Sequence, residues 1–346
     1  MTMVEAIQKL TARESLSRDD MRDVFGSLMR AETTPVQIAA FLTALRMKGE
    51  TVDEIVGAVQ AMRAAAISVH SDHAIIVDTC GTGGDGLGAF NVSTTAAFVV
   101  AGAGLTVAKH GNRSISSRCG SADVLETLGM PMQTNVEVAE NCLRTIGLAF
   151  LFAPAFHPAM KYAMPIRKEL GVRTIFNILG PLTNPASPHV QLIGVYDPIW
   201  LKPLAEVMVQ LGMKDGLVVH GQGNDEIVLS GPTQVVEIEN GELHLDELSP
   251  EDFGLKTQND ELLEGGLPQE NADLLRRILE GEKGPYREAV CMNSAALIQA
   301  AYRSSHGKKQ SISLQDGYKI AEESIDRKAA LGKLQALKDA LSGSPR

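Results

Sequence analysis

The feature that most constrains the fold is a change of hydrophobic periodicity near residue 70. Before it, apolar residues recur at helical spacing, and capped helices are predicted to begin at Ser17, Thr34 and Thr51. After it, helical segments separate short β-branched runs, which lie at 74–77, 105–108, 190–195 and 217–220. Strands that alternate with helices are typical of a largely parallel sheet covered by helices.

We therefore expect an α/β protein with two domains of unequal size. The smaller is all-helical and spans 1–66, and the larger is an α/β domain that spans 74–346 and has a mainly parallel central sheet. A hairpin turned at Asn240-Gly241 is predicted within 235–245. The Pro-rich segment 154–188 shows no strand signal and is expected to leave the sheet and join the N-terminal helices. The apolar faces of those helices exceed their own needs, so they should also pack on the α/β domain or on a second subunit.

Charge and cysteine content exclude several classes of function. The 346 residues include 42 acids and 32 bases, which give a net charge of −10, and aromatic residues are only 4%. Such a surface repels a phosphate backbone and offers little for base stacking, so nucleic acid is not an expected partner. The four cysteines form no CxxC pair, which fits a reducing cytoplasm. The longest apolar run, 96–105, is about half a membrane span, so no membrane is expected either.

A glycine-rich loop after the first predicted strand is the first candidate site. Residues 78–86 read DTCGTGGDG. Glycines let the backbone approach a bound anion and point N–H groups at it. The GxGxxG string is not a dinucleotide fingerprint, because 86–122 contain no acid to hold a ribose, and no Walker A lysine follows. We interpret the segment as an anion loop, with a plain tight turn as the alternative.

Two later segments point to the same anion. Asn91-Val92-Ser93-Thr94 opens an apolar helix, where the helix dipole favours a phosphate and a hydroxyl can ligate a metal bound to it. A simple N-cap is the alternative there. KHGNR at 109–113 follows the second strand, inside a window, 87–122, that has bases but no acid. This reversal of charge indicates an anionic ligand at the carboxyl end of the sheet, rather than a solvated basic loop.

An acid pair and a lone arginine complete the candidates. Asp225-Glu226 follows another predicted strand; such pairs commonly only solubilise, but beside a phosphate they could hold a magnesium ion. Arg167 is a natural receptor for a carboxylate, because a guanidinium can donate two parallel hydrogen bonds to it. The alternative for Arg167 is an ordinary base on the surface. His157, taken alone, would have only a structural role.

Together these segments resemble the anthranilate phosphoribosyltransferase family. The matching strings cover nearly the whole chain in order and spacing: GTGGDG at 81–86, NVST at 91–94, KHGNR at 109–113, GSADVLE at 120–126, FNILGPLTNP at 176–185 and the acid pair at 225–226. The family implies a fold like that of nucleoside phosphorylases and phosphoribosyltransferases. In it, a helical domain made of the first helices and those near 165–185 is joined by hinges to the α/β domain. It also implies a homodimer formed through the helical domain.

The resemblance implies that the amine of anthranilate attacks C1 of 5-phosphoribosyl 1-diphosphate, with two Mg²⁺ ions per active site. The products are N-(5-phosphoribosyl)anthranilate and pyrophosphate, in the second step committed to tryptophan biosynthesis from chorismate. The sugar diphosphate would be bound by Gly81, Gly84, Asp85, Asn91, Val92, Ser93, Thr94, Lys109, His110, Gly111, Asn112, Arg113, Ser114, Ile115, Ser116, Ser117 and Ser121.

The same resemblance assigns the acceptor side and the metal ligands. Anthranilate would lie beside Asn112, His157, Tyr162, Arg167 and Gly180, with Arg167 facing its carboxylate. Ser93 would ligate one magnesium ion, and Asp225 with Glu226 the second. The expected catalytic residues are Lys109, Asn112 and Arg167.

Physical chemistry adds an expectation about the mechanism. Departure of pyrophosphate leaves a cation-like ribosyl carbon, so the main task is to neutralise the leaving group and orient the amine. An arylamine needs little deprotonation before attack, so no dedicated strong base is expected, and His110 and His157 are interpreted as positioning groups.

Two positions depart from the family pattern. Ala89 replaces a residue that commonly carries a hydroxyl, and Cys119 replaces a common Ser or Thr. The cysteine would make its loop sensitive to oxidation if the thiol is exposed.

Two other functions are alternatives to phosphoribosyl transfer. A nucleoside phosphorylase of the same architecture is the nearest, although it uses inorganic phosphate and needs no diphosphate–metal clamp. A relative that binds nucleic acid is disfavoured by the net charge.

Overall fold

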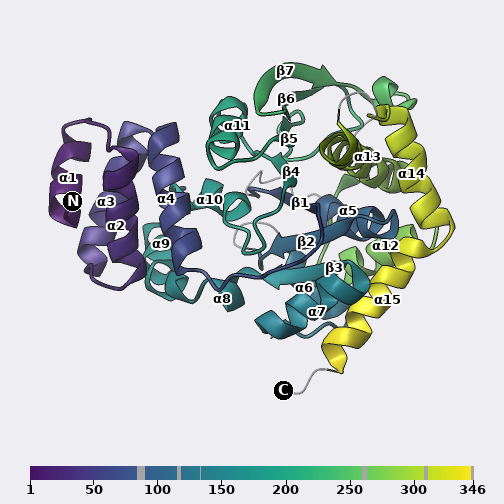
Figure 1. Cartoon of the computed structure of the whole chain (residues 1–346), viewed down its shortest axis with the longest axis horizontal. Helices are drawn as coiled ribbons and strands as arrows, with labels where there is room; N and C mark the ends of the chain where they lie inside the picture. Colours follow the sequence, from purple (N-terminus) through teal and green to yellow (C-terminus); the bar gives the residue numbers. More distant parts are fainter. Residues whose placement is uncertain (84–89, 115–117, 133, 259–262, 308–310, 344–346) are drawn as a thin grey trace.

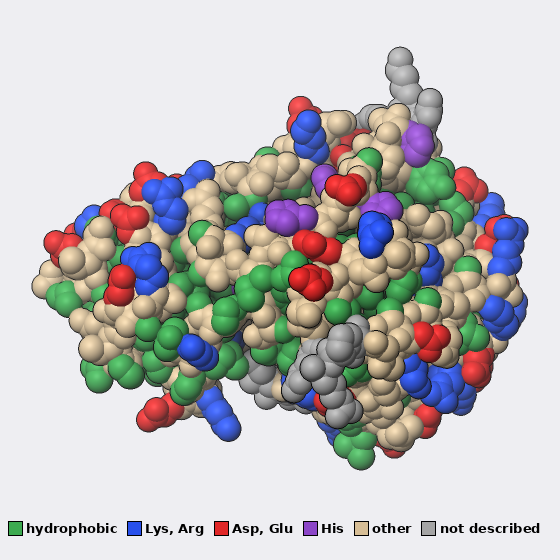
Figure 2. Space-filling model, turned by 60° about the horizontal axis from the view of Figure 1, so that its bottom comes forward, with side chains coloured by type: hydrophobic (Ala, Val, Ile, Leu, Met, Phe, Trp, Pro, Cys, Tyr) green, Lys and Arg blue, Asp and Glu red, His purple; other side chains and the backbone are tan. Residues whose placement is uncertain are grey.

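A helical domain lies at one end of the molecule and a larger α/β domain at the other (Figure 1). The computed structural model describes residues 1–83, 90–114, 118–132, 134–258, 263–307 and 311–343. On the face shown in Figure 2, acidic and basic side chains are interspersed, so neither sign forms a continuous surface there. Within the described residues, every helix is too short or too polar to cross a membrane.

The N-terminal helices begin where their capping residues predict. They are α1 (Met3–Thr11), α2 (Arg18–Met29), α3 (Pro35–Lys48) and α4 (Val52–Ala65). The side chains of Ser17, Thr34 and Thr51 each accept a hydrogen bond from the backbone N–H three residues further on. Each cap satisfies a donor that the first helical turn leaves unpaired, which is why the starts of α2, α3 and α4 agree with the sequence.

Two helices from the middle of the chain pack against this N-terminal group. They are α9 (Met164–Leu170), which contacts α3, and α10 (Phe176–Leu182), which contacts α4. The ring of Phe176 lies 5.4 Å from that of Phe25, which in turn lies 6.0 Å from that of Phe41. These contacts support the predicted extension of the helical domain by residues near 165–185.

The α/β domain is built on a seven-stranded sheet with the order β3-β2-β1-β4-β5-β6-β7. The first five strands in this order are parallel, and β6 and β7 are antiparallel. The predicted hairpin is present, with Asn240 and Gly241 both at positive φ in its turn. The strands are β1 (Ile76–Gly81), β2 (Thr106–Gly111), β3 (Leu148–Phe152), β4 (Val190–Gly194), β5 (Asp215–His220), β6 (Thr233–Glu239) and β7 (Glu242–Leu248).

Helices cover this sheet, as Figure 1 shows. The almost entirely buried α5 contacts β1 and β2 and is itself covered by α13, α14 and α15. The α-helices are α5 (Val92–Gly102), α6 (Ser121–Thr127), α7 (Val136–Ile146), α8 (Ala153–Phe156), α11 (Leu201–Gln210), α12 (Pro268–Leu279), α13 (Pro285–His306), α14 (Leu314–Asp326) and α15 (Ala329–Ser342). The 3-10 turns are η1 (Pro158–Tyr162), η2 (Pro198–Trp200) and η3 (Pro250–Phe253).

The two faces of the sheet belong to different hydrophobic cores. Leu192 and Val219 face the core formed with α5 and α13, whereas their neighbours Ile193 and Val218 face the opposite side. Successive side chains on a strand point to opposite faces, so this alternation follows from the pleat. The second core contains α11 and is continuous with the core of the helical domain, because α4 packs on α11. Part of the surplus apolar surface of the N-terminal helices, that of α4, is thus buried against the α/β domain.

Candidate active site

The candidate site lies at the carboxyl ends of the parallel strands. The register of the sheet places Gly81, at the end of β1, directly opposite Gly194, at the end of β4. The carboxyl edge of an open parallel sheet is where ligands usually bind. Of the predicted site residues, Gly84, Asp85, Ile115, Ser116 and Ser117, together with the departure at Ala89, lie outside the described residues.

Three glycines let the acid pair approach this edge. A Cβ atom added to Gly81 would collide with the carboxylate of Asp225, and one added to Gly194 would collide with the Asp225 backbone. A Cβ atom on Gly221 would collide with the backbone carbonyl oxygen of Glu226. The segment 221–226 can therefore lie against β1 and β4 only because these positions carry no side chain. Neither Gly194 nor Gly221 is among the site residues that the sequence predicts.

The acid pair contacts two of the predicted anion-binding segments. The backbone N–H of Gly83, in the glycine loop, donates to Asp225 Oδ2 at 2.7 Å. The backbone N–H of Ser93, in the first turn of α5, donates to Glu226 Oε1 at 3.1 Å. The structure thus brings the glycine loop, the start of the apolar helix and the acid pair together, as a clamp on a metal–diphosphate complex requires.

A buried asparagine from α13 fixes the position of the acid pair. Asn293 accepts a hydrogen bond from the Ile227 backbone N–H at 3.0 Å and donates to the Ile227 carbonyl at 2.9 Å. Asn293 is 1% exposed. It lies far from Ile227 in the sequence, and no local pattern distinguishes it from other helix residues. Its role is therefore visible only in the fold.

The start of α5 does not use a simple side-chain cap. Asn91 precedes the helix but makes no side-chain capping bond, and Ser93 and Thr94 lie inside the first turn. Asn91 instead accepts from the Asn271 amide at 2.9 Å and donates to the Cys119 carbonyl at 3.2 Å. The N-cap alternative for Ser93 and Thr94 is thus not what the structure adopts.

A buried carboxylate organises the end of β2. Asp78 is fully buried and accepts hydrogen bonds from the His110 backbone N–H at 3.3 Å, the Asn184 amide at 2.8 Å and the Gln191 amide at 3.2 Å. Burial raises the pKa of Asp78, while the positive charge of Lys109 acts to lower it. Because all three hydrogen-bond partners are donors, the geometry suits the ionised carboxylate. Lys109, itself 4% exposed, thus has a buried counter-charge nearby.

The basic loop after β2 is partly neutralised by acids of α6. Arg113 forms ion pairs with Asp123 at 3.1 Å and Glu126 at 2.7 Å. Both acids lie just beyond the acid-free window noted in the sequence. Asp123 also accepts from the Ser114 and Gly120 backbone N–H groups. In this state Arg113 shapes the loop by binding α6.

Further contacts within the loop are local. Ser121 Oγ accepts from the Asn112 backbone N–H and donates to the Asn112 carbonyl, each at 3.1 Å. A Cβ atom on Gly111 would collide with Ser121 Oγ and the Phe150 ring, so this glycine is needed for close packing. Cys119 is buried, and burial raises the pKa of its thiol to about 11. The condition for oxidation sensitivity, an exposed thiol, is therefore not met.

Two buried histidines lie side by side next to α10. The rings of His110 and His157 are 5.3 Å apart, and His110 Nδ1 lies 3.1 Å from the Gly180 carbonyl oxygen. A carbonyl can only accept, so Nδ1 of His110 carries the hydrogen and Nε2 a lone pair. Burial lowers the pKa of His110 to about 3 and that of His157 to about 4. Both rings are therefore neutral at pH 7.

Arg167 lies near the start of α10, beside Phe176. Its guanidinium is 5.0 Å from the centre of the Phe176 ring, and burial lowers its pKa to about 10. Within the described part of the chain, no acidic side chain forms an ion pair with it. Tyr162, which is 40% exposed, ends η1, and η1 contacts the helix that carries Arg167. Helix α10 thus connects Gly180, beside His110, with Phe176, beside Arg167.

Comparison with known proteins gives the class of this fold and site. Residues 4–66 match the family model described as "Glycosyl transferase family, helical bundle domain", and residues 73–331 match "Glycosyl transferase family, a/b domain". The two models together span most of the chain. The architecture is that of a glycosyl transferase with a helical bundle domain and an α/β domain.

Individual relatives narrow this class. Anthranilate phosphoribosyltransferase of Moorella thermoacetica is 49% identical over 332 residues, covering 96% of both chains. The crystal structure of anthranilate phosphoribosyltransferase from Thermus thermophilus has 44% identity and a TM-score of 0.91, covering 98% of this chain and 99% of that one. The Saccharomyces cerevisiae enzyme in complex with PRPP and Mg has 31% identity and a TM-score of 0.89, covering 99% and 98%. The chain belongs to the anthranilate phosphoribosyltransferase family, as the sequence motifs predicted.

Proposed function

We propose that the chain transfers the 5-phosphoribosyl group of 5-phosphoribosyl 1-diphosphate to the amine of anthranilate. The products are N-(5-phosphoribosyl)anthranilate and pyrophosphate, and the reaction is the second step committed to tryptophan biosynthesis. The observation that carries the proposal is the meeting, at one edge of the sheet, of main-chain donors from Gly83 and Ser93 with the carboxylates of Asp225 and Glu226.

The residues at this edge fit a magnesium–diphosphate complex. No group of three or more His, Cys, Asp or Glu side chains able to hold a metal occurs among the residues that the structure describes. Mg²⁺ is typically bound by one or two protein carboxylates together with substrate phosphates, and Asp225 and Glu226 match that donor set. Because Gly81 carries no Cβ atom, the Asp225 carboxylate can lie against the end of β1. We assign Asp225 and Glu226 to one ion and Ser93 to a second.

The diphosphate leaves with negative charge, which the site must neutralise. Mg²⁺, when bound, would stabilise that charge as a Lewis acid. From the chain itself, Lys109 supplies a positive charge at the end of β2, and the start of α5 supplies aligned N–H groups. We propose that Asp78 holds the His110 backbone through a hydrogen bond and Lys109 through its negative charge.

The other half of the site, here called the acceptor half, must bind anthranilate, which carries a neutral amine and a carboxylate. Arg167, half-buried and with no ion-pair partner among the described residues, suits the carboxylate of anthranilate. Nε2 of His110 and Nε2 of His157 are buried, and no hydrogen-bond partner for either occurs among the described residues. We propose that they accept hydrogen bonds from the amine and orient it. After the C–N bond forms, the strongly acidic arylammonium loses its proton readily, so these weakly basic rings or water suffice.

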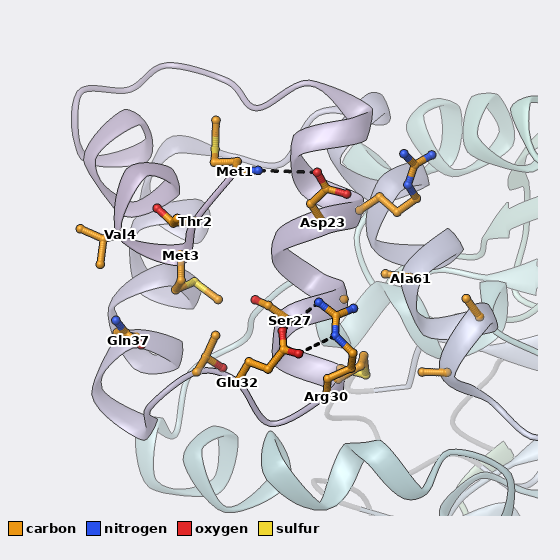
Figure 3. A pocket seen from close by; sticks show the side chains of 16 residues that line it. Met1, Thr2, Met3, Val4, Asp23, Ser27, Arg30, Glu32, Gln37 and Ala61 are labelled. Atoms are coloured by element: carbon orange, nitrogen blue, oxygen red, sulfur yellow. Dashed lines mark hydrogen bonds and ion pairs between the residues drawn. The ribbon is translucent and has the colours of Figure 1, made fainter.

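We also propose that the protein is a homodimer formed through the helical domain, in the cytoplasm. Val4 of α1 is 50% exposed and Val36 of α3 is 78% exposed. Val4 points away from α2 (Figure 3). Between these helices and α4 lies a pocket of about 750 Å³, bounded by the Met1–Asp23 and Arg30–Glu32 ion pairs. Sedimentation of the parent protein and of a Val36→Glu variant tests this, since a charge in the interface should favour the monomer.

The reaction itself is tested by the loss of anthranilate fluorescence on mixing the protein with 5-phosphoribosyl 1-diphosphate and Mg²⁺. The matched control is the Asp225→Asn, Glu226→Gln double variant, which keeps the size of both side chains. We expect magnesium-dependent decay with the parent protein and none with the variant. A folded parent protein that leaves the fluorescence unchanged would contradict the proposed reaction.

A further inference from the structure

The acid pair accepts hydrogen bonds from the same main-chain donors that the proposed function gives to the diphosphate. Asp225 Oδ2 lies 2.7 Å from the Gly83 nitrogen, and Glu226 Oε1 lies 3.1 Å from the Ser93 nitrogen. One donor belongs to the glycine loop after β1 and the other to the first turn of α5. Two separate anion-binding segments are therefore each engaged by a carboxylate from one dipeptide.

This arrangement is built into the fold. The glycines at 81, 194 and 221 leave room for the segment that carries the pair, and Asn293 holds the next residue from both sides. Asp225 and Glu226 are themselves only half-exposed. The carboxylates thus stand in for an anion at the donors.

The consequence differs for two kinds of anion. Inorganic phosphate or metal-free pyrophosphate must displace two carboxylates of like charge, with nothing to compensate for their displacement. An anion that arrives with a divalent cation gives the carboxylates a new partner as they leave the N–H groups. The acid pair therefore disfavours metal-free phosphates and favours phosphates that are bound to a divalent cation.

We propose that Asp225 and Glu226 determine the anion specificity of this site by excluding phosphates that carry no divalent cation. The inference rests on the proposed diphosphate site and adds a role beyond metal ligation. A carboxylate that only ligates metal affects a metal-free anion through its charge alone. A carboxylate that also occupies the main-chain donors must in addition be displaced before the anion can bind.

The test is the binding of inorganic phosphate and of pyrophosphate, measured by calorimetry with EDTA present. We expect an Asp225→Ala, Glu226→Ala variant to bind both anions about tenfold or more tightly than the parent protein, since like charges at a binding site are strongly unfavourable. If the double variant does not fold, as judged by circular dichroism, Asp225→Ala alone frees the Gly83 donor and should give a smaller gain.

A control variant distinguishes occupancy of the main-chain donors from general electrostatic repulsion between the protein and the anion. Asp197 follows β4, and its carboxylate accepts from the Ile199 backbone N–H at 3.1 Å. Asp197→Asn removes one negative charge near the same edge and leaves both donors engaged, so it should change phosphate affinity by less than about twofold. Unchanged or weaker metal-free binding in the folded double variant would overturn the proposal, as would an equal gain with Asp197→Asn.

The fluorescence assay and the calorimetry together keep the two proposals apart. Failure of the proposed function would appear as a parent protein that does not consume anthranilate, whatever its affinity for phosphate. Failure of the specificity role would appear as normal turnover by the parent protein with no gain of metal-free binding in the variants.

Discussion

The two halves of the candidate site recognise their ligands by different means. The diphosphate half relies on main-chain N–H groups and on glycines that let Asp225 and Glu226 come close. The acceptor half relies on buried side chains, whose pKa values are lowered by burial. The first half should therefore be sensitive to added volume, and the second to changes of charge and hydrogen bonding. Four substitutions can break or sharpen this contrast.

The largest effect is expected from added volume in the diphosphate half. Gly194→Ala should displace the 225–226 segment and lower kcat/KM for the sugar diphosphate by about a hundredfold, because small misplacements of catalytic groups are costly. Steady-state fluorescence kinetics measures this. Gly332→Ala in α15, where a Cβ atom meets nothing within 4 Å, is the matched control. Near-parental kinetics for Gly194→Ala would show that the close approach is unimportant.

The second-largest effect is expected from a change of charge in the acceptor half. Arg167→Gln should raise KM for anthranilate roughly ten- to hundredfold, the value of a hydrogen bond to a charged group, and leave KM for the sugar diphosphate nearly unchanged. Varying each substrate in turn separates the two constants. A change confined to the sugar diphosphate would place Arg167 in the other half.

A smaller effect follows from the buried histidines. The pKa of His157 is lowered from 6.5 to about 4, so the unfolded chain binds more protons between these values. Stability contributed by the neutral ring is complete above pH 6.5 and is lost as the pH falls towards about 4. Replacing His157 with Gln should therefore reduce the fall of Tm between pH 7 and pH 5.

The matched control for this prediction is His306→Gln, at an exposed position in the last turn of α13. It should leave the pH dependence of Tm as in the parent protein. An identical pH dependence in the His157→Gln variant would show that this ring is not held neutral by the fold.

The smallest effect is expected at Cys119. Its thiol is buried and its pKa is raised to about 11, so Cys119→Ser should change kcat/KM by less than about threefold. Alkylation of the native protein by iodoacetamide, followed by mass spectrometry, should find this thiol unmodified. Rapid modification accompanied by loss of activity would restore the sequence-based view of an oxidation-sensitive loop.

Local chemistry explains which elements could be predicted from the sequence. The starts of α2, α3 and α4 depend on Ser17, Thr34 and Thr51, and the hairpin turn depends on Asn240-Gly241. In each case the residues that decide the conformation are neighbours. Strand β3 was missed because its sequence LAFLF has no β-branched residue and no alternation. Its strand character comes from pairing with β2 in the buried edge of the sheet.

In the candidate site, too, local features could be predicted from the sequence and long-range contacts could not. The glycine loop, the start of α5, the basic loop and the acid pair could each be found as short strings. Their contacts could not, because the bonds from the acid pair to Gly83 and Ser93 join residues 142 and 133 positions apart. Asp78, Gly194 and Asn293 gain their roles only from such long-range contacts. The acids that neutralise Arg113 lie just outside the window that made it look unpaired.

The core shared by α4, α11 and one face of the sheet determines how far the chain can be shortened. A fragment that begins at residue 74 would lack α4 and would expose the apolar side chains of α10 and α11 that α4 now covers. Such a fragment should aggregate rather than fold as a small α/β protein. The N-terminal helices thus cover α10 and α11 rather than the sheet itself, and we expect the chain to tolerate fusions at its N-terminus better than deletions from it.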